Sequence, residues 1–321
     1  MVGRVAGHTV IRARDESRDR PVLIDVWYPA EQGALETDHD YGLGRGRVAE
    51  GAPALDTACP AIVLSHGAFG AANNYSWLAE HLAREGYLVA GVSHFRESYM
   101  YGVDTIDPAS AARPWLRPPD CTFALDHLEC HREFGRRVDA GRIGALGHSS
   151  GGATVIALAG AVYDPGAMER YCASDAARLD LGCAYARSGP PPSSAGEEAR
   201  RSYRDGRIRS IVALDPALGP GYPTEALAAV AVPVHVVGAV DNDFLPFASH
   251  AGHYATAIPG ASLTALTGGE GHFVYLDACS LDREANGVPL CRDRPGVDRA
   301  EVHASLAGVI TDFFEAHLAR P

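Results

Sequence analysis

The sequence contains no lysine, so its 28 basic positions are all arginine, and 40 acidic residues outnumber them. The resulting formal net charge of -12 at pH 7 argues against nucleic acid or an anionic membrane surface as the main partner. Long apolar runs are missing too, because no stretch approaches the ~20 residues that a membrane-spanning helix needs. We therefore expect a protein that neither binds nucleic acid nor spans a membrane.

Motifs for nucleotide binding are also missing. The sequence has no Gly-x-x-x-x-Gly-Lys-Ser/Thr loop and no Gly-x-Gly-x-x-Gly after a predicted strand. His127 and His131 stand four residues apart, and His250 and His253 three apart, but a zinc site needs three or four ligands. Since neither pair has an obvious further ligand, we predict no cofactor and no metal.

The chain has seven cysteines. Six of them form closely spaced pairs that would close local disulfide loops: Cys121/Cys130, Cys172/Cys183 and Cys279/Cys291. Cys59 is left over, and scattered reduced thiols are an equal alternative. Residues 1–14 lack the apolar core of a signal peptide, so we expect a protein that is cytoplasmic as given, or secreted with its leader removed. The oligomeric state stays open.

Apolar runs and helical patterns alternate along the chain. Residues 60–66 and 87–93 are continuous apolar runs, which are typical of strands buried on both faces. The complete set of predicted strands is 5–14, 21–28, 60–66, 87–93, 142–146, 208–214, 232–240 and 261–267. The predicted helices are 74–85, 121–137, 153–161, 247–258 and 302–318. This order predicts an α/β fold with a mostly parallel sheet that is flanked by helices.

Three segments fall outside this alternation. Residues 42–53 and 95–119 are expected to be loops. Residues 163–207 contain the run Gly-Pro-Pro-Pro-Ser-Ser and many arginines, and we interpret them as an insertion or lid. The whole chain, 1–321, is then a single domain that carries one lid-like segment.

The sequence Gly147-His148-Ser149-Ser150-Gly151 lies between a predicted strand and an Ala-rich predicted helix. Gly-x-Ser-x-Gly in this context is the nucleophile elbow, a turn so tight that its serine projects above the sheet. Larger residues at the two glycines would collide with the neighbouring strand and helix. Ser149 is therefore the predicted catalytic nucleophile.

A serine nucleophile needs a base, and the base needs an orienting acid. In this architecture both follow the serine in the order Ser, Asp/Glu, His. His272 ends a Gly-rich turn after strand 261–267 and is the predicted base. Asp241 follows strand 232–240 and is the favoured acid, with Asp243 as the alternative. Whichever of the two is not the acid is expected to cap the following helix or to accept a backbone N–H.

The oxyanion hole is expected to combine two backbone N–H groups. The first belongs to Ser150, directly after the nucleophile. The second comes from the loop after strand 60–66, where Ala68 is the predicted donor. His66 and His94 stand at strand ends in the same region, and we interpret both as hydrogen-bonding structural residues.

Together these residues make the chain resemble the α/β-hydrolase superfamily. More narrowly, it is similar to bacterial predicted dienelactone hydrolases, relatives of platelet-activating-factor acetylhydrolase. The matching pieces are Arg20-Pro21, Val26-Trp27-Tyr28-Pro29-Ala30, Leu64-Ser65-His66-Gly67, Tyr75-Ser76-Trp77-Leu78-Ala79-Glu80-His81-Leu82, Arg117-Pro118-Pro119-Asp120, Ala124-Leu125-Asp126, the elbow, Gly271-His272-Phe273, Cys279 and Asp298-Arg299.

The resemblance implies an eight-stranded sheet, a triad of Ser149, Asp241 and His272, and an oxyanion hole from Ala68 and Ser150. Two departures stand out. Dienelactone hydrolases use a cysteine nucleophile where this chain has a serine, and one extra residue separates Asp241 from Pro246.

We therefore expect a serine-dependent hydrolase of carboxylic esters that acts without a cofactor through an acyl-enzyme, on a small-molecule or polymeric ester. Its activity should rise with pH near the ordinary histidine pKa, because only a neutral imidazole acts as the base. Alternatives on the same fold are an amidase, lactamase or peptidase, and a polyester- or lipid-directed hydrolase. A non-catalytic binding protein is the alternative from another class.

Overall fold

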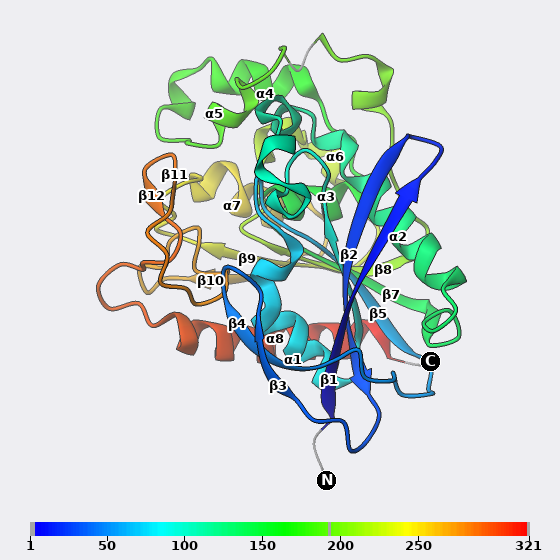
Figure 1. Cartoon of the computed structure of the whole chain (residues 1–321). Helices are drawn as coiled ribbons and strands as arrows, with labels where there is room; N and C mark the ends of the chain where they lie inside the picture. Colours follow the sequence, from blue (N-terminus) through cyan, green and yellow to red (C-terminus); the bar gives the residue numbers. More distant parts are fainter. Residues whose placement is uncertain (1–3, 192–193, 320–321) are drawn as a thin grey trace.

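The computed structural model describes residues 4–191 and 194–319 (Figure 1). At its centre lies a ten-stranded sheet with the order β10-β9-β8-β7-β5-β6-β2-β1-β4-β3. Its strands are β1 (Val5–Asp15), β2 (Arg20–Ala30), β3 (Thr37–Asp40), β4 (Arg45–Glu50), β5 (Cys59–Ser65), β6 (Leu88–Ser93), β7 (Val138–His148), β8 (Ile208–Leu214), β9 (Val234–Ala239) and β10 (Ser262–Leu266). A separate two-stranded hairpin pairs β11 (Glu284–Ala285) with β12 (Val288–Pro289).

The run of strands from β6 to β10 in the sheet is parallel throughout. Strand β2 pairs antiparallel with both β6 and β1. The predicted α/β fold with a mostly parallel sheet is thereby confirmed, and all eight predicted strands are present. The sheet is nevertheless larger than eight strands, because residues 42–53 contain β4 instead of only a loop, and β3 pairs with it.

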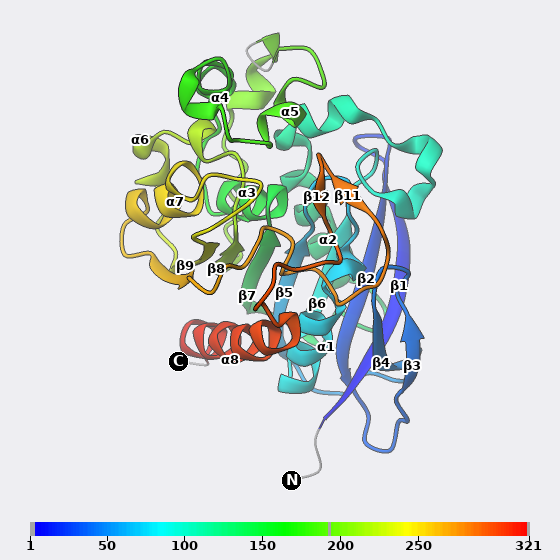
Figure 2. The ribbon, with the colours of Figure 1, turned by 90° about the vertical axis from the view of Figure 1, so that its left-hand side faces the viewer.

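Helices cover both faces of the sheet, as Figure 2 shows for α8 and α1 on one side and α3 and α7 on the other. The α-helices are α1 (Ser76–Glu85), α2 (Pro118–Cys130), α3 (Ser150–Leu158), α4 (Pro165–Cys172), α5 (Cys183–Ala186), α6 (Thr224–Leu227), α7 (Ala251–Ala257) and α8 (Arg299–Leu318). Short 3-10 helices occupy much of the expected loop 95–119: Tyr99–Tyr101, Val103–Thr105, Pro108–Ala112 and Pro114–Leu116. Others are Ala72–Tyr75, Asp175–Ala177, Glu197–Arg200, Gly219–Gly221 and Phe247–Ser249.

The central strands divide the hydrophobic core into two halves. Successive residues of a strand point to opposite faces of a sheet. In β5, Ala61 and Val63 accordingly pack in the cluster under α2 and α3, while Ile62 and Leu64 pack in the cluster under α1 and α8. Because both faces are covered, polar side chains can gather only at the strand ends and in the loops that follow them.

The expected lid segment, 163–207, contains the helices α4 and α5, so it has more regular structure than its composition indicated. Figure 1 places both helices at the top of the molecule, above α3. Residues 192 and 193 of its proline-rich run lie outside the described residues. A disulfide between Cys172 and Cys183 ties the end of α4 to the start of α5.

Two of the three possible cysteine pairs are disulfides, Cys172–Cys183 and Cys279–Cys291. Cys121 and Cys130 are free, which corrects the third pairing. Both stand on α2 nine positions apart, which corresponds to about 13.5 Å along the helix axis and is too far for a disulfide.

Within the described ranges, no helix is both long enough and apolar enough to pass through a bilayer.

Candidate active site

The serine elbow has the backbone geometry that the sequence predicts. Strand β7 ends at His148, helix α3 begins at Ser150, and Ser149 between them has φ 55° and ψ -120°. A non-glycine residue at this positive φ is strained, and such strain persists where the surrounding structure imposes it. A Cβ added at Gly147 would collide with the carbonyl of Gly151, and one added at Gly151 with the carbonyl of Ser65. The turn therefore requires both glycines.

Ser149 and His272 are brought together from distant parts of the chain. The serine Oγ lies 2.9 Å from Nε2 of His272, and both residues are buried. His272 reaches this position on the loop after β10, while Ser149 follows β7. The ring of Phe244 stacks on the imidazole, with the centroids 5.2 Å apart and the planes 12° apart, so His272 is shielded from solvent on that side.

The carboxylate beside His272 belongs to Asp215, and this corrects the prediction of Asp241. Asp215 directly follows β8, is 2% exposed, and its Oδ2 lies 3.5 Å from Nδ1 of His272. Its position is fixed by two donors, since Oδ1 accepts from the Ala239 N–H at 2.9 Å and Oδ2 accepts from Asn242 Nδ2 at 2.8 Å. We call Ser149, His272 and Asp215 the open constellation.

Neither of the two predicted acids forms an ion pair with the imidazole of His272, whose carboxylate partner is Asp215. Asp241 is exposed, and its backbone carbonyl accepts a hydrogen bond from Arg294. Asp243 accepts the backbone N–H of His272 at 2.9 Å and lies 3.3 Å from Arg294. The carboxylate of Asp243 therefore holds the histidine loop through its backbone, which is the role that the sequence left for the residue that is not the acid.

Burial is the largest influence on the pKa values of His272 and Asp215. Burial lowers the pKa of His272 well below its ordinary value, and the charge of Asp243 opposes this only in part. Burial raises the pKa of Asp215, while its hydrogen bonds from Ala239 and Asn242 act in the opposite direction. The imidazole is thus neutral around pH 7, which is the form that can accept a proton from Ser149.

Ala68 and Ser150, the predicted oxyanion donors, flank the nucleophile. Ala68 lies with Ser149 in the wall of one cavity, and Ser150 is the first residue of α3. The N–H of the preceding Gly67 is already used, because it donates to Tyr75 Oη at 3.0 Å. In the described part of the chain neither the Ala68 N–H nor the Ser150 N–H has a protein acceptor, so both remain able to bind a substrate oxygen.

A chain of hydrogen bonds that the sequence did not reveal joins this loop to the histidine loop. Tyr75 Oη accepts from Gly67 and lies 2.8 Å from Nδ1 of His148, whose Nε2 lies 3.0 Å from the backbone carbonyl of His272. With Nε2–H donating to that carbonyl, Nδ1 of His148 accepts the Tyr75 O–H. The sequence places His148 next to the elbow serine, which could have marked it as a site residue. Its hydrogen-bond partners, however, come from remote segments that the sequence does not connect.

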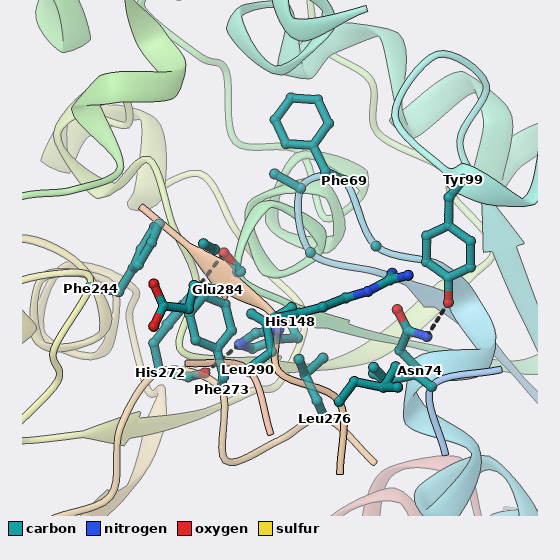
Figure 3. Close-up of a pocket in the computed structure, with 18 of the residues that line it drawn as sticks. Phe69, Asn74, Tyr99, His148, Phe244, His272, Phe273, Leu276, Glu284 and Leu290 are labelled. Atoms are coloured by element: carbon teal, nitrogen blue, oxygen red, sulfur yellow. Dashed lines mark hydrogen bonds between the residues drawn. The ribbon is translucent and has the colours of Figure 1, made fainter. Parts of the chain in front are cut away.

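A cavity of about 540 Å³ opens beside Ser149 and His272. Its wall is rich in aromatic side chains: Phe69, Tyr75, Tyr99, Tyr185, Phe244 and Phe273. Figure 3 shows Phe244 and His272 on one side of it and Tyr99 and Asn74 on the other. The loop closed by the Cys279–Cys291 disulfide supplies a further part of the wall, including Leu281 and Leu290.

A second Ser–His–Asp arrangement lies nearby and is entirely buried. Ser65 Oγ lies 2.8 Å from Nε2 of His94, and Nδ1 of His94 lies 2.9 Å from Asp120. None of the three is more than 1% exposed, and none lines the cavity. We call Ser65, His94 and Asp120 the closed constellation.

Residues beside the closed constellation hold the loop after β5, which carries Ala68. Nε2 of His66 accepts the backbone N–H of His94, and Arg117 donates to the carbonyls of His66 and Gly67 while it pairs with buried Glu97. The structural interpretation of His66 and His94 is therefore confirmed by their contacts.

The two histidine pairs that the sequence offers as metal ligands do not form a metal site among the described residues. His250 pairs with Asp180 at 2.7 Å, and His253 lies 2.8 Å from the carbonyl of Tyr222. His127 and His131 have neighbouring rings, but within residues 4–191 and 194–319 no third ligand joins them.

Comparison with known proteins agrees with this architecture. A solved ferulic acid esterase from Streptomyces cinnamoneus superposes with a TM-score of 0.60 at 19% identity, over 100% of this chain and 94% of that one. The chain has the α/β-hydrolase fold. The fold that the resemblance implied is thereby confirmed.

A curated relative is similar over a shorter stretch. Bis(hydroxyethyl) terephthalate hydrolase of Streptomyces coelicolor is 28% identical over 111 residues. The matched stretch covers 35% of this chain and 32% of the relative, so the chain spans about a third of the length of that protein. No family model matches the chain.

Proposed function

We propose that the protein is a serine-dependent hydrolase of carboxylic esters. The observation that carries the proposal is the open constellation: a strained serine 2.9 Å from a buried neutral histidine, at the wall of a cavity. The names of the two similar proteins support it, because both denote enzymes that hydrolyse esters. Ser149 and His272 keep their predicted roles in the proposal, and Asp215 replaces Asp241 as the acid.

The proposed mechanism assigns each step of ester hydrolysis to a residue of this site. Ser149 Oγ attacks the acyl carbon while Nε2 of His272 accepts its proton, and the carboxylate of Asp215 stabilises the imidazolium. The N–H groups of Ala68 and Ser150 bind the oxyanion of the tetrahedral intermediate. The imidazolium then protonates the departing alcohol, which leaves an acyl-enzyme. A water molecule, deprotonated by His272, attacks this ester and releases the acid and the serine.

The volume and the aromatic wall of the cavity support a small ester with an aromatic acyl group as the substrate. Its volume of about 540 Å³ lies within the usual range for small-molecule sites, and aromatic rings make up much of its wall. Ferulic acid and terephthalate, named in the two similar proteins, are aromatic acids. Amide cleavage on the same constellation is the second candidate, because a Ser–His–Asp site can also cleave amides.

The two disulfides favour the secreted alternative for localisation, since disulfides persist in oxidising compartments. We include secretion in the proposal on this ground.

The test is hydrolysis of p-nitrophenyl esters from acetate to palmitate, together with methyl ferulate and bis(hydroxyethyl) terephthalate, by the wild type and by Ser149→Ala. We expect serine-dependent turnover with a preference for short or aromatic acyl groups. A preference for palmitate would support the lipid-directed alternative. If matched anilides are turned over faster than the esters, the protein is an amidase and not an esterase.

A further inference from the structure

Three side chains with metal-binding atoms converge where β4 joins the sheet. His8 of β1, His39 of β3 and Glu50 of β4 each offer one ligand atom, and these atoms all lie within 4.8 Å of one another. Nδ1 of His8 lies 2.8 Å from Glu50 Oε2, and Nδ1 of His39 lies 3.4 Å from the same oxygen. Two imidazoles and one carboxylate therefore face a common point.

We propose that His8, His39 and Glu50 bind a divalent zinc ion. Imidazole and carboxylate ligands bind zinc at about 2.0–2.2 Å, so the atoms of a tetrahedral set lie roughly 3.3 Å apart. The distances from Glu50 Oε2 to the two imidazole nitrogens, 2.8 and 3.4 Å, bracket this value. Two histidines and a carboxylate, with a water molecule as fourth ligand, are a known zinc-binding combination.

Asp25 supplies the outer contact that such a site needs. Its Oδ1 lies 3.1 Å from Nε2 of His8, and both side chains are 2% exposed. With Nε2–H donating to Asp25, the lone pair of Nδ1 is directed toward Glu50 and His39. A carboxylate behind a ligating histidine fixes the tautomer and the ring orientation in this way at many zinc sites.

The exposure of the three ligands leaves a path for the ion. The His8 side chain is buried, but that of His39 is 27% exposed and that of Glu50 49% exposed. Figures 1 and 2 both show β3 and β4 far from α4 and α5, and none of the three ligands lines the cavity at Ser149. The metal site is thus separate from the proposed catalytic site and does not depend on the proposed function.

The position of the site indicates a structural role. Strand β4 pairs with β1 at only two positions, Gly7–Ala49 and His8–Glu50, and β3 is held to the sheet through β4. An ion bound by one residue from each of these strands would fasten the β3–β4 hairpin to the body of the sheet.

The experiment is titration of the full-length, chelator-treated protein with zinc chloride, by calorimetry and by thermal unfolding. We expect one zinc ion per chain and a Tm that rises with zinc. The variants His39→Ala and Glu50→Gln change partly exposed side chains, and each should weaken zinc binding at least about tenfold and abolish the rise in Tm. His127→Ala, which alters a histidine pair elsewhere on the molecule, is the matched control and should bind zinc as the wild type does.

Absence of zinc binding by the wild type would overturn the proposal. So would unchanged binding by both His39→Ala and Glu50→Gln, or a loss of binding in His127→Ala, because each would place the ion elsewhere. In the first case His8 is a hydrogen-bonded bridge between Asp25 and Glu50 and no more.

Discussion

The open and the closed constellation have the same three residue types and similar serine–histidine distances, yet their surroundings differ. In the closed one the serine ends the regular strand β5, and its aspartate accepts from Arg18 and Arg20 as well as from the histidine. In the open one the serine has a strained backbone, lines a cavity and is followed by an N–H without a protein acceptor among the described residues.

The comparison shows that a hydrogen-bonded triad does not by itself make a catalyst. The closed constellation has the better histidine–aspartate contact, 2.9 Å against 3.5 Å, but no substrate can reach its serine. Access, backbone geometry and free oxyanion donors identify the reactive serine, and these features come from the elbow and the cavity.

Replacing each of the two serines by alanine should give the largest difference in activity between the two constellations. Ser149→Ala should lower kcat for ester hydrolysis by about 10⁴-fold or more, because both nucleophilic steps are lost. Ser65→Ala should leave kcat within about tenfold. It should instead reduce the free energy of unfolding by about 1–3 kcal/mol, since Nε2 of buried His94 loses its partner. Steady-state kinetics and urea unfolding of both variants measure this contrast, and a greater kinetic loss in Ser65→Ala would reverse our assignment.

The acid of the open constellation is tested by a second pair of variants. Asp215→Asn should lower kcat by about 10³-fold or more, because the imidazolium loses its stabilising carboxylate. Asp241→Asn should stay within about twofold, since that side chain is exposed and away from His272. Kinetics on the same ester decide between them. If Asp241→Asn is the slower variant, the acid predicted from the sequence was right.

The closed constellation should appear in the pH dependence of stability. Burial acts to raise the pKa of Asp120, but hydrogen bonds and charges from His94 and Arg20 outweigh it and hold this pKa well below the ordinary range. A depressed folded-state pKa contributes stability above the unfolded pKa of about 4, and this stability is lost as the pH falls below it.

Asp120→Asn should therefore lose about 3–5 kcal/mol at pH 7, because two partly buried arginines, Arg18 and Arg20, lose the countercharge of this buried carboxylate. Its stability should also decline less steeply between about pH 4 and pH 2 than that of the wild type. Chemical denaturation at a series of pH values measures both effects. Parallel pH curves for the two proteins would contradict the role given to Asp120.

The smallest expected effect concerns the acidic side of the pH profile of kcat/KM. Burial lowers the pKa of His272, so the neutral base persists below the ordinary histidine value of 6.5. Since protonation abolishes the base, kcat/KM should fall only below that pH. This expectation differs from the rising limb that the sequence predicts near the ordinary histidine pKa. A midpoint at pH 7 or above would instead mean that the charge of Asp215 outweighs burial.

The sequence predicted the local features of the site and missed those that depend on how distant loops meet. Ser149 stands in a motif whose glycines are required by contacts within a few residues and by one strand, so it was predictable. His272 follows the last parallel strand on a Gly-rich turn. Asp215 also follows a strand directly, and this was the available signal. Which strand end places its aspartate beside the imidazole depends on the path of the His272 loop. The apolar pattern of the sequence does not predict that path.

The same reason explains the other differences. His39 and Glu50 lie in residues without a strong hydrophobic pattern, where β3 and β4 form only by pairing with each other and with β1. Their proximity to His8 follows from that pairing. The eight predicted strands were found because each shows a continuous or alternating apolar pattern, even β10, whose residues are exposed or only partly buried.

The most direct test of the central claim is reaction with a fluorophosphonate probe, followed by mass spectrometry of the labelled peptides. Such probes phosphonylate a serine that an adjacent base activates. We predict one label per chain on Ser149, no label on Ser65, and loss of labelling in Ser149→Ala with labelling retained in Ser65→Ala. Absence of label from Ser149 in the folded wild type, or label on another serine, would contradict the claim that the open constellation is the active site.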